Sequence, residues 1–264
     1  MIRVSNLTMV FSPGTPLEKH ALNGIDLEIE RGEFVSVIGS NGSGKSTLLN
    51  VVAGDLSPTT GKVEIGGRNV TRWATARRAA LVARVFQDPL AGSCGELTIE
   101  ENLALAAARG TRRGLGRAIT SSRRAMFKDR VAELGLGLEK RLTDKMGMLS
   151  GGQRQAASLL MATLAPTSVL LLDEHTAALD PGMAEFVIDL TTEVVSESGR
   201  TAMMVTHSMG QALSVGTRTI MLHEGRVILD VRGEERRGLT IEDLVTKFRN
   251  MRGKPVDNDA LLIG

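Results

Sequence analysis

Residues 34–53 read FVSVIGSNGSGKSTLLNVVA, and this stretch decides the fold. The continuous apolar run Phe34 to Ile38 is typical of a central parallel strand that is covered on both faces. The segment Gly39 to Thr47 fits the phosphate-loop pattern G-x-x-x-x-G-K-[ST], and Ser46 to Ala53 is predicted to form the helix that follows. A buried strand, a glycine-rich turn and a helix in this order predict an α/β core that binds phosphate groups.

Each residue type in this loop has a physical role. The glycines let backbone N–H groups turn toward phosphate oxygens, and the helix N-terminus adds the positive end of its dipole. Lys45 is expected to hold the β- and γ-phosphates, Ser46 to ligate Mg²⁺ and Thr47 to contact the α-phosphate. The alternative is a glycine-rich turn that binds nothing. The residues expected to bind ATP are Gly39, Ser40, Asn41, Gly42, Ser43, Gly44, Lys45, Ser46 and Thr47.

The composition is that of an ordinary folded protein. The 264 residues are 42% apolar and 23% charged, and 32 Lys and Arg against 30 Asp and Glu leave a formal net charge of +2. These values argue against a disordered chain or one organised by charged tails. Aromatic residues make up only 3%, so a platform of stacked rings for single-stranded nucleic acid is not expected. One cysteine, Cys94, excludes an internal disulfide.

Other segments predict the rest of an α/β fold. Strands are expected where short apolar or alternating runs lie between Gly, Pro and Asn, and helices where apolar residues recur at helical spacing. The predicted strands are 2–11, 25–29, 63–65, 169–172, 202–206, 219–223 and 226–229, and the further predicted helices are 100–109, 123–134, 151–165 and 239–249.

The run Val169 to Glu174, VLLLDE, is an apolar strand that ends in two acids. Asp173 is expected to bind Mg²⁺ through water, and Glu174 to act as the general base that polarises the attacking water. An Asp-Glu pair after a strand is by itself often only a helix cap. Combined with the phosphate loop, it favours nucleotide hydrolysis.

A third motif is Leu149-Ser150-Gly151-Gly152-Gln153. Ser150 and Gln153 have the spacing of a capping box that begins a helix. A helix N-terminus with two glycines also exposes unpaired N–H groups, which attract a phosphate. Because the phosphate loop already encloses the nucleotide of its own chain, we expect this second anion site to address a nucleotide held by another copy.

With this motif followed by LLLDEHTAALD at 170–180, the chain resembles the ATP-binding cassette (ABC) ATPases from about residue 2 to residue 228. The resemblance implies an α/β phosphate-loop NTPase core with a mixed sheet, an antiparallel β subdomain and an inserted α-helical subdomain at roughly 88–165. The cassette would occupy 1–250, followed by a polar tail at 251–264. In such proteins two cassettes pair head to tail, so that Ser150, Gly151, Gly152 and Gln153 contact ATP in trans.

Four further residues match family positions. Gln87 matches the glutamine that contacts Mg²⁺ and water and links the helical subdomain to the core, although an ordinary exposed Gln at a strand end is the alternative. His207 matches the histidine that reaches the γ-phosphate, and Asp180 the loop acid at the dimer interface. Phe11 is expected to stack on adenine or to pack within the β subdomain.

The chain departs from the family at His175, where most members have proline after the catalytic glutamate. One interpretation is that a titratable group beside Glu174 tunes the water-activating base. The other is a surface histidine with no catalytic part.

The complete motif set predicts the ATP-binding and ATP-hydrolysing subunit of an ABC transporter, with ATP and Mg²⁺ as its cofactors. No apolar run approaches the roughly 20 residues of a membrane-spanning helix, so a separate permease is expected. The first residues, MIRVSNLTMVF, lack the apolar region of a signal peptide, which predicts a peripheral protein at the cytoplasmic face of the cell (inner) membrane. The cargo is expected to be a small imported solute such as an amino acid.

The expected partners are a second cassette, the permease and an extracytoplasmic substrate-binding protein, but no nucleic acid. A basic stretch at 109–130 is either a solvated helical face or a contact for anionic lipid or an acidic partner. The alternative function is a soluble ABC ATPase of iron–sulfur assembly or one linked to ribosomes or nucleic acid.

Overall fold

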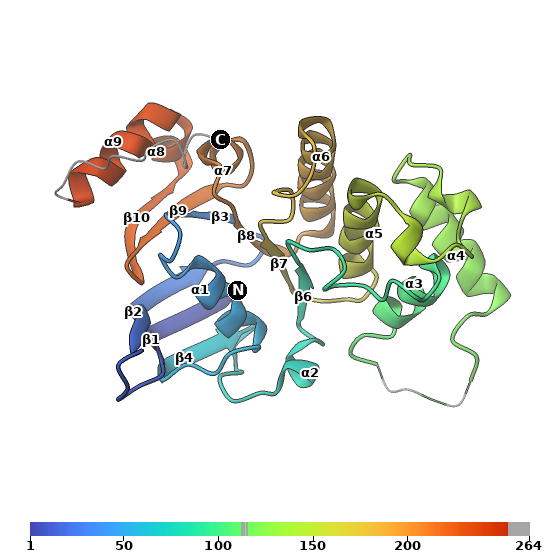
Figure 1. Ribbon diagram of the computed structural model, residues 1–264, viewed down its shortest axis with the longest axis horizontal. Helices are drawn as coiled ribbons and strands as arrows, with labels where there is room; N and C mark the ends of the chain where they lie inside the picture. Colours follow the sequence, from blue (N-terminus) through green and yellow to red (C-terminus); the bar gives the residue numbers. More distant parts are fainter. Residues whose placement is uncertain (112–113, 115, 253–264) are drawn as a thin grey trace. The chain divides into compact units, whose positions relative to one another are not determined.

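The computed structural model describes residues 1–111, 114 and 116–252, which form two compact units (Figure 1). Unit 1 consists of Met1–Thr75 and the chain from Gly199 onward, and unit 2 consists of Ala76–Ser198. The phosphate loop and His207 belong to unit 1. Gln87, the Asp173-Glu174 pair and the Ser150 motif belong to unit 2.

In unit 1 the strand before the phosphate loop lies between two parallel neighbours. β3 (Phe34–Ile38) pairs with β8 (Thr201–Val205) on one side and with β9 (Arg218–His223) on the other. Every residue of β3 and β8 is buried, which explains why both are continuous apolar runs. The sheet is mixed because β10 (Arg226–Arg232) pairs antiparallel with β9.

A second, antiparallel sheet of unit 1 has the order β2-β1-β4-β5. Its strands are β1 (Ile2–Phe11), β2 (Lys19–Ile29), β4 (Thr60–Ile65) and β5 (Arg68–Asn69). β2 begins six residues earlier than predicted, at Lys19 instead of Ile25. The pairing with β1 shifts register on either side of Gly24, which has a φ of +70°, and this bulge breaks the alternation by which a strand is recognised.

The helices of unit 1 are α1 (Lys45–Ala53), α7 (Met209–Ser214), α8 (Gly233–Arg237) and α9 (Ile241–Arg252). Residues from β3, β9, β10, α7 and α9 form one hydrophobic core cluster, which includes Ile38, Met221, Leu244 and the fully buried Phe248. This core anchors the carboxyl end of β3, where the phosphate loop starts.

Unit 2 holds two parallel strands, β6 (Val82–Val85) and β7 (Val169–Asp173). Its helices are α3 (Ile99–Ala107), α4 (Ser121–Ala132), α5 (Gly151–Thr163) and α6 (Pro181–Ser198), with short 3₁₀ helices at Leu138–Lys140 and Met146–Met148, and α2 (Thr75–Arg78) lies at the unit boundary. Figure 1 shows α3, α4 and α5 close together. Their residues share a core that includes Leu103, Phe127 and Leu160, with Phe186 and Leu190 of α6 packed against it.

Helix α6 was absent from the sequence-based predictions. Its start signals are present, because Pro181 occupies the first helical position and Asp180 caps it: Met183 N donates to Asp180 Oδ1 at 3.1 Å. Unit 2 contains the whole predicted helical subdomain together with β6, β7 and α6, and the predicted division of the chain into 1–250 and 251–264 stays a prediction. Residues 253–264 of the predicted tail lie outside the described residues. None of the described helices has the length and apolar character needed to cross a membrane.

Candidate functional site

The phosphate loop of unit 1 has the backbone geometry that its pattern predicts. Gly39, Gly42 and Gly44 all have positive φ, with values of +148°, +79° and +104°. A Cβ at Gly39 would lie 2.2 Å from Leu222 O, and one at Gly44 would lie 2.5 Å from Ala21 O. Only glycine fits at these two positions, because backbone atoms leave no room for a side chain and L-residues rarely adopt this conformation.

The side chains of the loop are placed to meet an anion. Lys45 is buried, and its Nζ donates to Gly39 O at 2.7 Å and to Ser40 O at 3.2 Å, so the ammonium lies under the turn. Ser43 Oγ is buried without a hydrogen-bond partner. Ser46 is exposed and Thr47 half-buried in the first turn of α1. These features form a cradle with a positive charge and a free donor, which fits the phosphates of ATP.

The hairpin between β9 and β10 buttresses this loop. Gly225 N donates to Ser43 O at 3.0 Å, and Asn23 holds the hairpin through Nδ2 to Glu224 O at 2.7 Å. The predicted strands 219–223 and 226–229 leave only Glu224-Gly225 to connect them, and the contact of this turn with the phosphate loop had no signal in the sequence. The hairpin therefore holds Ser43 of the phosphate loop in place.

His207 follows β8 at the same edge of the sheet at which Gly39 follows β3, since Thr206 N donates to Val37 O at 3.1 Å. The turn is held on its other side by Ser208, which caps α7. His207 is half-buried there, as expected for a residue that reaches a ligand on the loop. Phe11 lies at the end of β1 and is also half-buried, so stacking on adenine and packing within the sheet both stay open.

The acids of unit 2 lie at the carboxyl end of β7. Asp173 is the last residue of the strand, and Glu174 follows it with a φ of +43°. A left-handed conformation is costly for a residue with a side chain, by about 1–2 kcal/mol, and such positions cluster at functional sites. The backbone turn is closed by Ala177 N, which donates to Glu174 O at 3.0 Å. The strand end therefore presents both carboxylates in a fixed turn.

His175 is not the surface histidine that one interpretation expected, because it is only 2% exposed. Its Nε2 lies 2.9 Å from Thr191 Oγ1 of α6, and that hydroxyl donates to Val187 O at 2.7 Å. Because the Thr191 hydroxyl proton is used in the bond to Val187 O, Nε2–H of His175 is the donor to Thr191 Oγ1. Burial lowers the pKa of His175 to about 4, so the ring is neutral at neutral pH and the idea that its titration tunes Glu174 there loses its basis.

The Ser150 motif begins α5 as a capping box. Gln153 N donates to Ser150 Oγ at 3.2 Å, and Ser150 N donates to Gln153 Oε1 at 3.3 Å. Gly151 is exposed, whereas a Cβ at Gly152 would lie 2.4 Å from the end of the Met183 side chain on α6. The first glycine keeps the helix start open to a ligand, and the second lets α5 approach α6 closely.

Gln87 lies just beyond β6, and β6 pairs in parallel with β7 in the register Val85 to Leu172. The Gln87 segment and the Asp173-Glu174 turn therefore follow their strands at the same edge of this strand pair. Gln87 is exposed, and the preceding residue, Phe86, is tied to α5 because Gln155 Nε2 donates to Phe86 O at 3.1 Å. Gln155 is fully buried and was missed by sequence reasoning.

Arg84 was missed as well. It lies on β6 and forms an ion pair with Asp173, with 2.5 Å between Nη2 and Oδ2. The sequence held a signal, because a charge inside the apolar run Val82-Ala83-Arg84-Val85 needs a partner. Arg154 is a third such residue, which donates to the carbonyls of Met146, Gly147 and Leu149 and so fixes the loop before Ser150.

The donor set fits magnesium better than a metal held by protein alone. In the described part of the chain, no three His, Cys, Asp or Glu side chains gather as a metal site. Magnesium takes one or two protein oxygens and keeps waters and substrate phosphates as its other ligands. Asp173, at a strand end of unit 2, is a ligand of this kind, and so, taken by itself, is Ser46 at the start of the phosphate-loop helix of unit 1.

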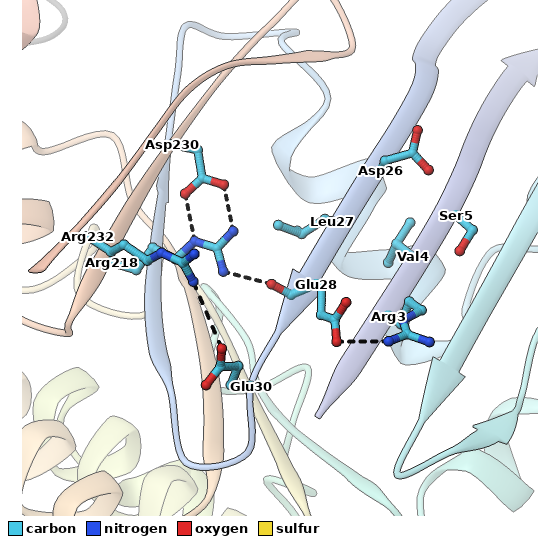
Figure 2. A pocket seen from close by; sticks show the side chains of 10 residues that line it. All are labelled: Arg3, Val4, Ser5, Asp26, Leu27, Glu28, Glu30, Arg218, Asp230 and Arg232. Carbon is cyan, nitrogen blue, oxygen red and sulfur yellow. Dashed lines mark hydrogen bonds and ion pairs between the residues drawn. The ribbon is translucent and has the colours of Figure 1, made fainter.

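Unit 1 also contains a groove of about 620 Å³, which is a second candidate for the phosphate-binding site (Figure 2). Arg218 donates to both carboxylate oxygens of Asp230 at 2.6 Å and to Glu28 O at 2.7 Å. Figure 2 marks these hydrogen bonds with dashed lines. Arg3 pairs with the Glu28 side chain at 2.9 Å. The hydrogen bond to Asp230 raises the pKa of Arg218 above its ordinary value. Three arginines and four carboxylates line this groove, so it has no excess of positive charge and offers no cradle for phosphate.

The basic stretch at 109–130 also has internal partners. Arg124 donates to both oxygens of Glu100, at 2.6 and 2.7 Å, and Arg130 pairs with Glu133 at 2.8 Å. Arg117, Arg123 and Lys128 are exposed. Arg112 and Arg113 lie outside the described residues. The solvated face fits these observations, and contact with lipid or an acidic partner stays a prediction.

Known proteins resemble this chain over most of its length. A family profile described as ABC transporter matches residues 22–177. The tyrosine transport ATP-binding protein of Clostridioides difficile (strain R20291) is 42% identical over 248 residues, which are 94% of this chain and 98% of that protein. The thiamine import ATP-binding protein ThiQ of Salmonella typhimurium is 36% identical over 213 residues, which are 81% and 86% of the two chains.

Solved structures support the same relationship. An ATP-binding cassette in a dimeric post-hydrolysis state, bound to ADP and Pi, has a TM-score of 0.77 at 30% identity and covers 90% of this chain and 100% of that chain. This match confirms the predicted α/β cassette fold, with its mixed sheet, antiparallel sheet and helices.

Proposed function

Because this chain belongs to the ABC transporter family as an ATP-binding subunit with ATPase activity, we propose that it drives import of a small solute through a separate permease at the cytoplasmic face of the membrane. The observation that carries the proposal is the phosphate-loop cradle, in which Lys45 lies under a glycine turn and Ser43 Oγ is an unpaired buried donor. The 42% identity to a tyrosine transport protein supports an amino acid as cargo.

We assign the ATP contacts of the site by the chemistry of each side chain. Lys45 and the loop N–H groups neutralise the phosphate charge, and Glu174 takes the proton from the attacking water. His207 orients the γ-phosphate. Mg²⁺, when bound, offsets phosphate charge, and Ser46, Gln87 and Asp173 would hold it directly or through water.

The exposed start of α5 supports a site completed by a second copy. The Ser150 hydroxyl, the Gly151 N–H and the side-chain NH₂ of Gln153 lie at a helix N-terminus, where an anion is favoured. We propose that two cassettes pair head to tail, with Asp180 at the interface, and that the α5 start binds the γ-phosphate of the partner's ATP. A permease and an extracytoplasmic substrate-binding protein complete the proposed assembly.

Glu174→Gln tests this function. The amide cannot accept the proton of the attacking water, so turnover should fall at least about 100-fold while ATP still binds and drives dimerisation. The measurements are phosphate release, sedimentation with and without ATP, and uptake of labelled amino acids by cells that carry the variant in place of the wild type. Normal hydrolysis would refute the base assignment, and undiminished uptake of every amino acid would refute the proposed cargo class.

A further inference from the structure

The carboxylate of Asp173 already has a cationic partner within unit 2. Arg84 Nη2 lies 2.5 Å from Asp173 Oδ2, and the two side chains are only 13% and 14% exposed. At this burial the pair is poorly screened by water and salt, unlike an exposed ion pair. The guanidinium therefore cancels most of the negative charge of the Asp173 carboxylate.

Arg84 is also held from its other side. Its guanidinium carbon lies 4.6 Å from the centre of the Phe86 ring, within the range of a cation–π contact. Phe86 in turn accepts a hydrogen bond from the buried Gln155 of α5. Unit 2 thus has an unbroken set of contacts from Asp173 through Arg84 to the segment before Gln87 and to the helix that begins at Ser150.

This arrangement conflicts with metal binding at Asp173. A guanidinium and a divalent cation compete for the same carboxylate oxygens, and two positive groups a few Å apart repel each other at the low effective dielectric of a buried site. Asp173 can receive the metal only if Arg84 shifts or shares the carboxylate. A shift of Arg84 also changes its contact with the Phe86 ring.

We propose that Arg84 is the resident counter-ion of Asp173, a positioning residue that neutralises this carboxylate before magnesium nucleotide binds and sets the affinity with which it binds. The inference rests on the proposed function, since it takes Asp173 as the magnesium-binding acid. Free Mg²⁺ has to compete with the guanidinium without the phosphates of a nucleotide as further ligands. Arg84 therefore makes Asp173 selective for magnesium that is already in complex with nucleotide. The release of Arg84 from Asp173 couples metal binding to the positions of Phe86 and Gln87.

The test measures how Mg²⁺ changes the affinity for a fluorescent ADP analogue, so that no hydrolysis is involved. Arg84→Met removes the charge and keeps a flexible, polarisable chain over Phe86. We expect Mg²⁺ to strengthen ADP binding about tenfold more in this variant than in the wild type. Arg84→Lys keeps the charge and should retain a Mg²⁺ dependence close to that of the wild type.

Arg124→Met is the matched control, because it also removes an arginine from an ion pair of unit 2, the one with Glu100, away from the strand end. It should leave the Mg²⁺ dependence unchanged. Thermal unfolding gives a second measurement: R84M should melt below the wild type without ligand and gain more than the wild type from Mg²⁺ and ADP together. If R84M cannot be purified folded, Arg84→Gln replaces it under the same criteria.

An equal Mg²⁺ dependence in R84M and the wild type, or an equal change in R124M, would overturn the counter-ion role and leave Arg84 a structural ion pair. If the wild type bound ADP with no response to Mg²⁺, the proposed magnesium site itself would fail. If the wild type did not bind ADP at all, the proposed function would fail. These outcomes separate the two proposals.

Discussion

At the scale of the residue, the most informative side chain is His175. It lies beside Glu174, but its ring is buried and its Nε2–H is bound to Thr191. Buried in the folded protein and hydrated in the unfolded one, the ring binds a proton less readily in the folded state, with a pKa near 4 instead of the ordinary 6.5. His175 therefore affects the free energy of unfolding at acidic pH.

We predict that the free energy of unfolding falls as the pH is lowered from 6.5 to 4. Between these values the unfolded chain binds a proton at His175 and the folded chain does not, so stability is lost with acid, by up to about 3 kcal/mol for a pKa near 4. Urea unfolding at several pH values checks this, with His175→Gln expected to give a shallower loss.

Equal slopes for the wild type and H175Q would contradict the prediction. ATP turnover above pH 6 should show the same pH profile in H175Q and in the wild type.

At the scale of the element, two helices of unit 2 begin with the same device. The side chains of Ser150 and Gln153 cap α5, and those of Thr98 and Glu101 cap α3, each as a complete capping box. The structural part of the two caps is therefore comparable. Only the α5 start is proposed to contact nucleotide, so the pair separates a structural role from a functional one.

Ser150→Ala and Thr98→Ala should each cost about 1 kcal/mol of unfolding free energy, because each removes the acceptor for a backbone N–H. S150A should in addition lower ATP turnover about tenfold or more, since a hydrogen bond to a charged phosphate is lost. T98A should hydrolyse ATP at the rate of the wild type. Chemical unfolding and phosphate release measure both effects, and equal turnover in the two variants would refute the role of Ser150 in trans.

At the scale of the whole molecule, the proposed head-to-tail pair predicts complementation between two inactive variants. Lys45→Ala spoils the phosphate loop but leaves the α5 start intact, and Ser150→Phe does the reverse. A mixed dimer has one complete site, so an equal mixture should regain about a quarter of the wild-type turnover if the subunits pair at random. The measurement is ATP hydrolysis of each variant alone and of the mixture, and no gain on mixing would exclude sites shared between copies.

Much of the cassette could be predicted from the sequence because its elements have local causes. β1 and β3 have the predicted bounds, since period-two alternation and a continuous buried run are both visible in the chain. The turn that begins at Gly39 requires positive φ and close backbone approach, so its glycines mark it without any knowledge of the fold. Helix α6 had local signals too, in Asp180 and Pro181, and was overlooked.

By itself, then, the sequence determined the family, the phosphate loop and the acids at the end of β7, because motif chemistry depends on residues that are adjacent in the chain. Only the tertiary structure decided which side chains surround them. Arg84 is 89 residues from Asp173, and Gln155 is 69 residues from Phe86. Burial of His175 and neutralisation of Asp173 depend on packing between distant segments, and a single sequence carries no record of that packing.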